Sequence, residues 1–441
     1  MFHRISMVGL GYIGLPTAAL FAAHGVRVIG VEVSPDIVET INAGKIHLVE
    51  PDLDGVVHNV VSKGLLQATL TPEPAEAFVI AVPTPFKDDL EPDLSRIESA
   101  ARMIAPVLEK GNLVILESTS PVGATEKMAM WLAEARPDLS FPQDAGENAD
   151  IQIAYCPERV LPGKILSELI HNDRIIGGMT NRASKMAVSL YKQVVKGECV
   201  ITDARTAEMC KLTENSSRDV QIAFANELSM VADRLGIDVW ELITLANRHP
   251  RVNILQPGAG VGGHCIAVDP WFIVSSAPHE AKLIKTAREV NDHKPEWVLH
   301  KVKDAVFETL GAEPQRAMAN IKVACLGLAF KPDIDDLRES PALEITKQVA
   351  QMGCRVLAVE PHVDALPECF DETPTTLTPL NEALEQADVV AVLVKHSAFV
   401  HDASAVASQA RVIDAVGLLP GVTRGPVVSR PRLTTHAVKA A

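Results

Sequence analysis

The stretch Arg4-Ile5-Ser6-Met7-Val8-Gly9-Leu10-Gly11-Tyr12-Ile13-Gly14 decides the fold of the first part of the chain. Residues 4–8 predict a short buried strand, and the glycines that follow have the G-x-G-x-x-G spacing of a turn between a strand and a helix. An apolar helix then runs to about His24, and residues 26–31 predict a second strand that ends at Glu32. This β-α-β unit is the building block of a doubly wound parallel sheet.

The glycine turn is typical of a site for the pyrophosphate of a dinucleotide. Gly9 permits the turn, Gly11 lets a phosphate approach the backbone, and Gly14 allows close packing of the helix on the strand. The helix N-terminus supplies N–H groups and the positive end of the helix dipole. Glu32 has the spacing of an acid that binds ribose hydroxyls, and its charge would repel a 2′-phosphate. The sequence therefore predicts NAD as the cofactor, with purely structural glycines as the alternative.

Further elements extend this sheet and lead to a second one. Strands are expected at residues 77–82, 113–117, 151–155, 321–326, 353–360, 389–394 and 411–413. Apolar residues at helical spacing predict one long central helix from about Ala204 to Leu235. Other helices are expected at residues 282–307 and 341–352, with a linker at 312–319.

The segment Gly353–Glu360 repeats the pattern of Gly25–Glu32, which indicates a second β-α-β unit. We therefore expect an α/β protein with two Rossmann-like doubly wound parallel-sheet domains, joined by a central helical domain that contains the long helix. The expected domains are residues 1–203, 204–311 and 320–425. The tail after about Pro420 is expected to fray.

Composition excludes several classes of partner. The net charge of −15 argues against nucleic acid or an anionic membrane as the main partner, and an aromatic content of 4% argues against stacking of single-stranded nucleic acid. No apolar stretch is long enough for membrane insertion. The seven cysteines are scattered and form no C-x-x-C pair, which is typical of reduced thiols in the cytoplasm without a zinc framework. We expect a cytoplasmic protein without a bound metal.

The segment Gly258–Trp271 carries the most distinctive thiol. Glycines precede His264 and Cys265, and Asp269 follows four residues after the cysteine. Because glycines let a backbone approach a ligand closely, this thiol is a candidate for holding a substrate covalently. A buried cysteine that serves only as a small apolar residue is the alternative.

The predicted central helix offers cations and an amide on one face. Lys211 and Asn215 are four residues apart, and Arg218 follows three residues later, so all three share that face. If the fold brings Lys211 near a thiol, it would lower the thiol pKa or stabilise an oxyanion. The plain alternative is a solvated helix face.

Polar residues also follow predicted strands, where α/β sheets place their ligands. Thr119 and Glu158 lie in two such loops and could hold a hydrolytic water, although ordinary loop chemistry is an alternative for each. In the second β-α-β unit, Lys331 and Arg338 stand where a Rossmann crevice binds nucleotide, and two cations suit a diphosphate. Surface charges on a degenerate copy of the nucleotide fold are the alternative.

Taken together, these motifs resemble the UDP-glucose/GDP-mannose dehydrogenase family over nearly the whole chain. The motifs that carry the resemblance are the glycine turn, Val82-Pro83-Thr84-Pro85, Ser118–Gly123, Cys156–Arg159, the Lys211/Asn215 helix, the Cys265 loop and Phe330–Pro341. Residues 208–215, 247–253 and 264–271 are most similar to members that act on UDP-N-acetyl-D-mannosamine. UDP-glucose enzymes have Pro-Lys-Asp where this chain has Ala267-Val268-Asp269.

The resemblance implies an NAD-dependent four-electron oxidation of the C6 alcohol of a UDP-sugar. Cys265 would hold a thiohemiacetal and then a thioester, and two NAD would be consumed. Lys211 and Asn215 would stabilise the oxyanion, with Lys211 relaying protons. Asp269 would assist proton transfer, and Glu158 with Thr119 would direct water. The implied catalytic residues are thus Cys265, Lys211, Asn215, Asp269, Glu158 and Thr119.

The resemblance also implies binding residues and a homodimer that forms through the central helices. The cofactor-binding residues would be Gly9, Gly11, Tyr12, Ile13, Gly14, Glu32, Thr84, Thr119 and Thr125. The substrate-binding residues would be Arg159, Val160, Lys211, Asn215, Arg218, His249, Arg251, Gly262, Lys331 and Arg338. The alternatives are UDP-glucose or UDP-N-acetylglucosamine as substrate, a two-electron hydroxyacid dehydrogenase, and an NAD-sensing protein without activity.

Overall fold

The computed structural model describes residues 1–48, 50–87, 90–161, 163–263 and 265–419. His264 and the tail expected to fray after Pro420 lie outside these residues. The chain divides into two compact units, the first formed by Met1–Ser217 and Val268–Lys285, and the second by Arg218–Ala267 and the chain from Thr286 onward. The boundaries of the three expected domains stay a prediction.

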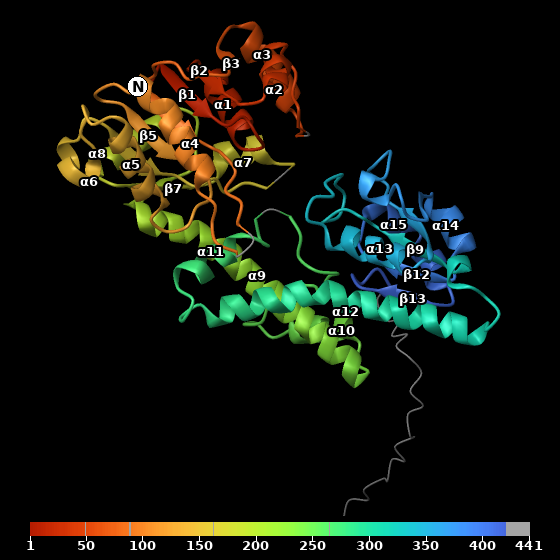
Figure 1. Cartoon of the computed structure of the whole chain (residues 1–441). Coiled ribbons are helices and arrows are strands. Elements are labelled where there is room, and N and C mark those ends of the chain that lie inside the picture. Colours follow the sequence, from red (N-terminus) through yellow and green to blue (C-terminus); the bar gives the residue numbers. More distant parts are fainter. Residues whose placement is uncertain (49, 88–89, 162, 264, 420–441) are drawn as a thin grey trace, which may run out of the picture. The chain divides into compact units, whose positions relative to one another are not determined.

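An eight-stranded sheet organises the first unit, drawn red to yellow in Figure 1. Its order is β3-β2-β1-β4-β5-β6-β7-β8. The strands are β1 (Arg4–Val8), β2 (Arg27–Val31), β3 (Leu66–Thr69), β4 (Ala77–Ile80), β5 (Leu113–Leu116), β6 (Gln152–Tyr155), β7 (Arg174–Gly178) and β8 (Cys199–Asp203). Strands β1 to β6 are parallel, which confirms the predicted doubly wound sheet, but β7 pairs antiparallel with β6. This pair of edge strands was not predicted, because two glycines weaken the strand pattern of β7.

Helices cover both faces of this sheet because successive strand residues point to opposite sides. In β1, Ile5 and Met7 belong to one buried core and Val8 to the other. The first core is covered by α1 (Gly14–Ala23), α3 (Leu53–Ser62), α7 (Ile165–His171) and α8 (Asn181–Tyr191), and the second by α4 (Ser95–Ile104) and α5 (Ala124–Ala135). The first unit also contains α2 (Pro35–Asn42), α6 (Pro142–Ala145) and α11 (Asp269–Ser276).

The second unit contains a five-stranded parallel sheet of order β11-β10-β9-β12-β13, which confirms the second Rossmann-like fold. Its strands are β9 (Lys322–Leu326), β10 (Arg355–Val359), β11 (Thr375–Leu377), β12 (Val389–Val392) and β13 (Val412–Asp414). Its helices are α10 (Val239–Ala246), α13 (Pro341–Gln351), α14 (Leu380–Gln386), α15 (Ser397–His401) and α16 (Ala403–Ala407). The repeat seen in the sequence corresponds to β2 and β10, each of which pairs in parallel with the first strand of its sheet.

Two long helices have residues in both units. Helix α9 spans Ala204–Leu235, as predicted, and α12 spans Lys282–Ala312. Helix α12 is longer than the predicted 282–307 and takes in the first residue of the expected linker. Within the part of the chain that the structure describes, no helix is both long enough and apolar enough to span a membrane.

Candidate active site

Of the three glycines in the turn after β1, one has room for a ligand beside it. Gly9 has φ +89°, and a Cβ there would overlap the carbonyl oxygen of Ala81. A Cβ on Gly14 would overlap the carbonyl oxygen of Gly9. By contrast, a Cβ on Gly11 would meet nothing within 4 Å, so the backbone at this position is open. The turn therefore fits the pyrophosphate of NAD on the open side of Gly11.

Glu32 is held in place beside this turn. Its Oε2 accepts the N–H of Leu10 at 3.0 Å, and its Oε1 accepts the N–H of Val33 at 2.8 Å. The carboxylate stays partly exposed, so it can also accept hydrogen bonds from ribose hydroxyls. Tyr12 is exposed in the turn before α1, and the hydroxyl of Thr84 donates to the carbonyl oxygen of Thr119.

Thr125 is completely buried at the N-terminus of α5. Its N–H and its hydroxyl donate to Oε1 of Glu208 at 2.8 and 2.6 Å, and the N–H of Gly123 donates to Oε2 at 2.6 Å. Burial raises the pKa of Glu208, although these donors oppose the rise. Glu208 thus ties the loop that follows Thr119 to the helix that carries Lys211. Our sequence interpretation gave Glu208 no role. Glu208 lies one helical turn before the candidate Lys211 and within an apolar pattern, and this position was the signal in the sequence that could have indicated a role for it.

Buried Lys211 and Asp269 form a polar cluster with the partly buried Asn215 in the first unit. Lys211 is only 9% exposed on α9, and Asp269 is 3% exposed at the start of α11. The side-chain amide of Asn215 donates to the carboxylate of Asp269. Burial raises the pKa of Asp269 to about 6, opposed by the Asn215 hydrogen bond and by the charge of Lys211. This cluster can exchange protons near neutral pH.

Glu158 lies in the loop after β6 and is 7% exposed. Burial raises its pKa to about 7, with the charge of Lys211 as the largest opposing effect. Its Oε1 has no hydrogen-bond partner among the residues that the structure describes. A buried carboxylate oxygen without a partner is costly unless a water or a ligand satisfies it. Glu158 is therefore suited to act as a base on a bound water.

The cysteines differ sharply in accessibility. Cys156 and Cys325 are buried, and burial raises the pKa of each to about 12, so neither is a good nucleophile. Cys265 is exposed, as is Cys369. Of the cysteines, Cys265 is the one that combines exposure with a glycine-rich loop.

The glycines before Cys265 have an internal packing role that the sequence did not indicate. A Cβ on Gly262 would overlap the carbonyl oxygen of Glu339, and one on Gly263 would lie 3.1 Å from the ring of Phe330. A Cβ on Gly260 would lie 2.8 Å from both Pro295 and Pro341. We expected these glycines to let the backbone approach a ligand. The structure shows in addition that side chains there would collide with neighbouring segments of the second unit, and the approach of a ligand stays a prediction.

The expected substrate-binding residues belong to both units. Arg159 forms an ion pair with Glu214 at 2.6 Å in the first unit. In the second unit, Arg338 forms an ion pair with Asp336 at 2.7 Å, and Lys331 Nζ lies 5.7 Å from the ring centroid of Phe330. The other expected residues are placed as follows: Val160 is partly buried, whereas Arg218, His249 and Arg251 are exposed. The structure thus groups Lys211, Asn215, Asp269 and Glu158 in one unit and places Cys265, Lys331 and Arg338 in the other.

Comparison with known proteins identifies the architecture. Models of the UDP-glucose/GDP-mannose dehydrogenase family match residues 3–195 as the NAD binding domain, 205–293 as the central domain and 324–420 as the UDP binding domain. The chain belongs to the UDP-glucose/GDP-mannose dehydrogenase family. The predicted family and the predicted cofactor, NAD, are therefore confirmed, and the protein is an NAD-dependent nucleotide-sugar dehydrogenase.

Individual relatives match along almost the whole chain. UDP-N-acetyl-D-mannosamine dehydrogenase from Yersinia pestis is 65% identical over 399 residues, 90% of this chain and 94% of the relative. NDP-N-acetyl-D-galactosaminuronic acid dehydrogenase from Ralstonia nicotianae is 60% identical over 399 residues, 90% of this chain and 92% of that relative. The solved structure of UDP-D-ManNAc dehydrogenase from Pyrococcus horikoshii has a TM-score of 0.83 at 37% identity and covers 96% of this chain and 97% of its own.

Proposed function

We propose that this protein oxidises the C6 alcohol of UDP-N-acetyl-D-mannosamine to the carboxylate. One alcohol, two NAD and one water would give one carboxylate, two NADH and three protons. The largely buried cluster of Lys211, Asn215, Asp269 and Glu158, in a chain with an NAD-binding turn, is the observation that carries the chemistry. The name of the Yersinia pestis relative, at 65% identity, favours this sugar.

The first oxidation needs a group that takes the proton of the C6 hydroxyl. Bound NAD supplies the acceptor for the hydride. In this proposal Lys211 and Asn215 stabilise the developing oxyanion, and Lys211 passes the proton onward. Asp269, with a pKa of about 6, lies in the same cluster and assists the proton transfer. Burial of this cluster strengthens each of these interactions because little water competes.

The second oxidation needs the aldehyde to be held covalently. The sulfur of Cys265 forms a bond to the aldehyde carbon, and the thiol proton neutralises the resulting alkoxide, giving a thiohemiacetal. Loss of a second hydride and a proton gives a thioester. Water then attacks the thioester, Glu158 takes a proton from that water, and the C–S bond breaks to release the acid and the thiol. Thr119, in the loop after β5, would help to position the water.

A second sugar has a specific observation in its favour. The Ralstonia nicotianae relative acts on an NDP-linked N-acetylgalactosamine derivative according to its name, and it is 60% identical. UDP-N-acetyl-D-galactosamine is therefore the second candidate substrate. UDP-glucose and UDP-N-acetylglucosamine stay as further alternatives for the same chemistry.

The deciding experiment supplies a panel of these four UDP-sugars and counts NADH per acid formed. We expect two NADH per acid and the highest kcat/KM with UDP-N-acetyl-D-mannosamine. One NADH per product would contradict the four-electron reaction. Cys265→Ser should abolish net acid formation, whereas Cys369→Ser, which alters the other exposed thiol, should leave it unchanged. Normal acid formation by Cys265→Ser would eliminate the covalent mechanism.

We also propose a homodimer that forms through the second half of α9. Phe224, Val231 and Leu235 expose 54%, 47% and 65% of their surfaces on this helix, more than apolar side chains usually do. Burial against a second copy would remove them from water. Sedimentation analysis of the wild type and of Phe224→Asp tests this surface, since the variant should shift towards monomer. A cytoplasmic location stays a proposal that rests on the scattered reduced cysteines.

A further inference from the structure

A buried histidine connects the ends of three strands in the second unit. His396 follows β12 and is completely buried. Its Nδ1 accepts the N–H of Asp333 at 3.0 Å, in the loop after β9, and its Nε2 lies 3.1 Å from Oε2 of Glu360, which follows β10. Because Nδ1 is an acceptor here, the ring proton is on Nε2 and is donated to Glu360. One imidazole therefore links the three loops.

The same segment is fixed by further hydrogen bonds. Oε2 of Glu360 also accepts the N–H groups of Leu328 and Ala329 at 2.7 and 3.0 Å. The carboxylate of Asp333 accepts the N–H and the hydroxyl of Ser397 at 2.8 and 2.6 Å. Burial acts to raise the pKa of Glu360, but the hydrogen bonds from His396 and Leu328 outweigh it and the pKa lies below its ordinary value. Residues 328–333 are thus attached at both ends.

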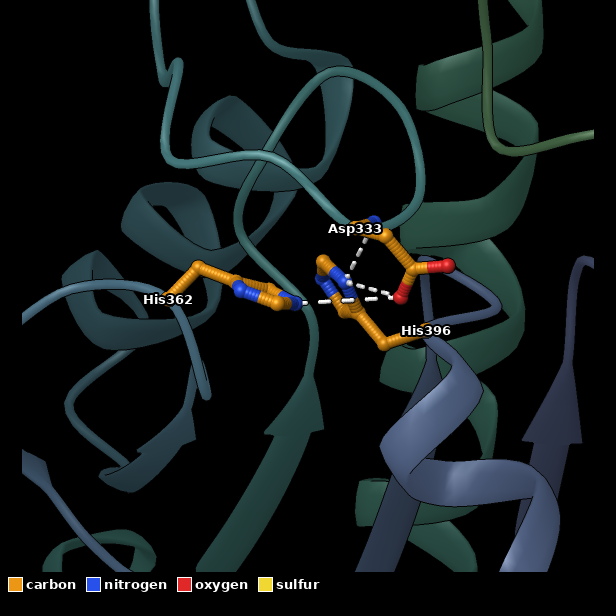
Figure 2. Close-up of side chains that lie close together, drawn as sticks. All are labelled: Asp333, His362 and His396. Carbon is orange, nitrogen blue, oxygen red and sulfur yellow. Dashed lines mark hydrogen bonds and ion pairs between the residues drawn. The ribbon is translucent and has the colours of Figure 1, made fainter. Parts of the chain in front are cut away.

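The residue types in this cluster would also suit a divalent cation. Figure 2 shows Asp333, His362 and His396 gathered at one point. However, the Nδ1 lone pair of His396 already accepts an amide N–H, and the carboxylate of Asp333 already accepts two bonds from Ser397. His362 Nε2 is 3.7 Å from Asp333 Oδ1, a separation that two ligands of one metal can have, so only the hydrogen bonds that His396 and Asp333 already make count against a metal. The cluster is satisfied as it stands, so we interpret it as a positioning device.

The positioned segment contacts the loop of the candidate nucleophile. Phe330 lies between Ala329 and Lys331, and its ring packs against Gly263, two residues before Cys265. Gly262 is in contact with the carbonyl oxygen of Glu339 and with Pro341, farther along the same segment. Residues 328–341 therefore touch the Cys265 loop on one side and are attached to His396 on the other.

We propose that His396 is a positioning residue for two loops at once. By fixing residues 328–333, it holds Lys331 in place for the diphosphate of the substrate and holds Phe330 against the glycines before Cys265. The part of this inference that concerns the diphosphate rests on the proposed function. The part that concerns Cys265 rests on the packing alone.

Two substitutions separate the two hydrogen bonds of His396. His396→Asn keeps an oxygen near the Nδ1 position for the N–H of Asp333 but loses Glu360. His396→Gln keeps a donor near the Nε2 position for Glu360 but loses Asp333. His401→Asn, at an exposed histidine of α15, is the matched control. Thermal unfolding of each full-length variant shows whether it is folded at the assay temperature.

We expect both His396 variants to raise the KM for the UDP-sugar about tenfold, with the KM for NAD unchanged, as removal of one buried hydrogen bond allows. Alkylation of Cys265 by iodoacetamide, followed by mass spectrometry, should become faster in both variants and unchanged in His401→Asn. Unchanged KM and alkylation in folded variants would overturn the proposal. An equal rise in both KM values would show a general structural role instead.

Three further results are informative. Stoichiometric zinc in the purified wild-type protein that is lost in His362→Ala would replace the positioning role with a metal site. If the wild type oxidises none of the UDP-sugars, the proposed function fails, but the alkylation rates still test the link between His396 and Cys265. Ser397→Ala, which removes one of two bonds to Asp333, should give a smaller increase in alkylation than either His396 variant.

Discussion

The turns after β1 and β9 share a backbone geometry but differ in what surrounds their acids. Gly9 and Gly327 have φ of +89° and +90°. The N–H of Gly9 donates to the carbonyl oxygen of Val31, and the N–H of Gly327 donates to that of Val359, both at 2.8 Å. Each acceptor is the last residue of the neighbouring strand. The next N–H, from Leu10 or Leu328, donates to Glu32 or Glu360, respectively. The two β-α-β units therefore place an acid at the same point of the turn.

The surroundings of the two acids differ. Glu32 stays partly exposed, whereas Glu360 is 5% exposed and bonded to the buried His396. In the second turn Ala329 and Pro332 take the positions that Gly11 and Gly14 have in the first. The first turn thus leaves space for a pyrophosphate and a ribose. In the second turn, the imidazole of His396 is hydrogen-bonded to Glu360. A shared supersecondary structure does not determine the ligand; the residues beyond the acid do.

The largest effect should come from filling the open position of the first turn. Gly11→Val introduces a side chain where a Cβ meets nothing within 4 Å, so folding should be retained. The side chain would occupy the approach of the pyrophosphate, and we expect NAD affinity to fall about 100-fold or more. Isothermal calorimetry with NAD measures this loss, and thermal unfolding provides the control. Unchanged NAD affinity would show that this turn is not the cofactor site.

A second test exchanges charge for a neutral amide at each acid. Glu32→Gln should raise the KM for NAD about tenfold, because hydrogen bonds to charged groups contribute roughly 1.5–3 kcal/mol. Glu360→Gln should leave the KM for NAD unchanged and lower the free energy of unfolding by about 1–3 kcal/mol, since its buried partners lose a charged acceptor. Steady-state kinetics and denaturant unfolding of both variants are needed. The proposed difference between the two turns would be wrong if Glu360→Gln raised the KM for NAD as much as Glu32→Gln does.

A smaller effect, on the pH dependence of stability, distinguishes Glu360 from Glu158. Hydrogen bonds lower the pKa of Glu360, whereas burial raises the pKa of Glu158 from 4.5 to about 7. Between pH 4.5 and about 7, Glu158 keeps its proton in the folded protein but releases it in the unfolded chain. The contribution of Glu158 to the free energy of unfolding therefore falls as the pH rises through this range. Glu158→Gln should therefore raise the free energy of unfolding by about 1–3 kcal/mol at pH 8.5 and by little at pH 4. Denaturant unfolding at both pH values measures this difference.

The same variant should lose acid formation if Glu158 activates the water. A lower stability at pH 8.5, or full acid formation, would contradict the assignment of a buried base. Glu39→Gln, at an exposed acid of α2, is a suitable control.

Much of the fold could be predicted because it follows from local patterns. The turn at Gly9–Gly14 and the repeat of Gly25–Glu32 at Gly353–Glu360 both depend on neighbouring residues, and both were confirmed as β-α-β units. The antiparallel pairing of β7 with β6 depends on contacts between distant segments, and no local pattern indicated it.

The site was less predictable for the same reason. Lys211 and Asn215 follow from helical spacing, but Glu208 bonds to Gly123 and Thr125, which are more than 80 residues away. His396 stands alone between Lys395 and Ser397, without spacing that points to Glu360. The glycines before Cys265 were recognised as unusual, yet the partners that require them, Phe330 and Pro341, could not be inferred from the chain alone.

Glu208 has one more consequence, which concerns competition between anions. Helices α1 and α5 each begin after a strand of the first sheet, and each N-terminus attracts negative charge. At α5 the carboxylate of Glu208 already takes that place, whereas α1 has no acid in its first turn. One of the protein's own carboxylates thus occupies the N-terminus of α5, and the N-terminus of α1 remains for the diphosphate of the cofactor.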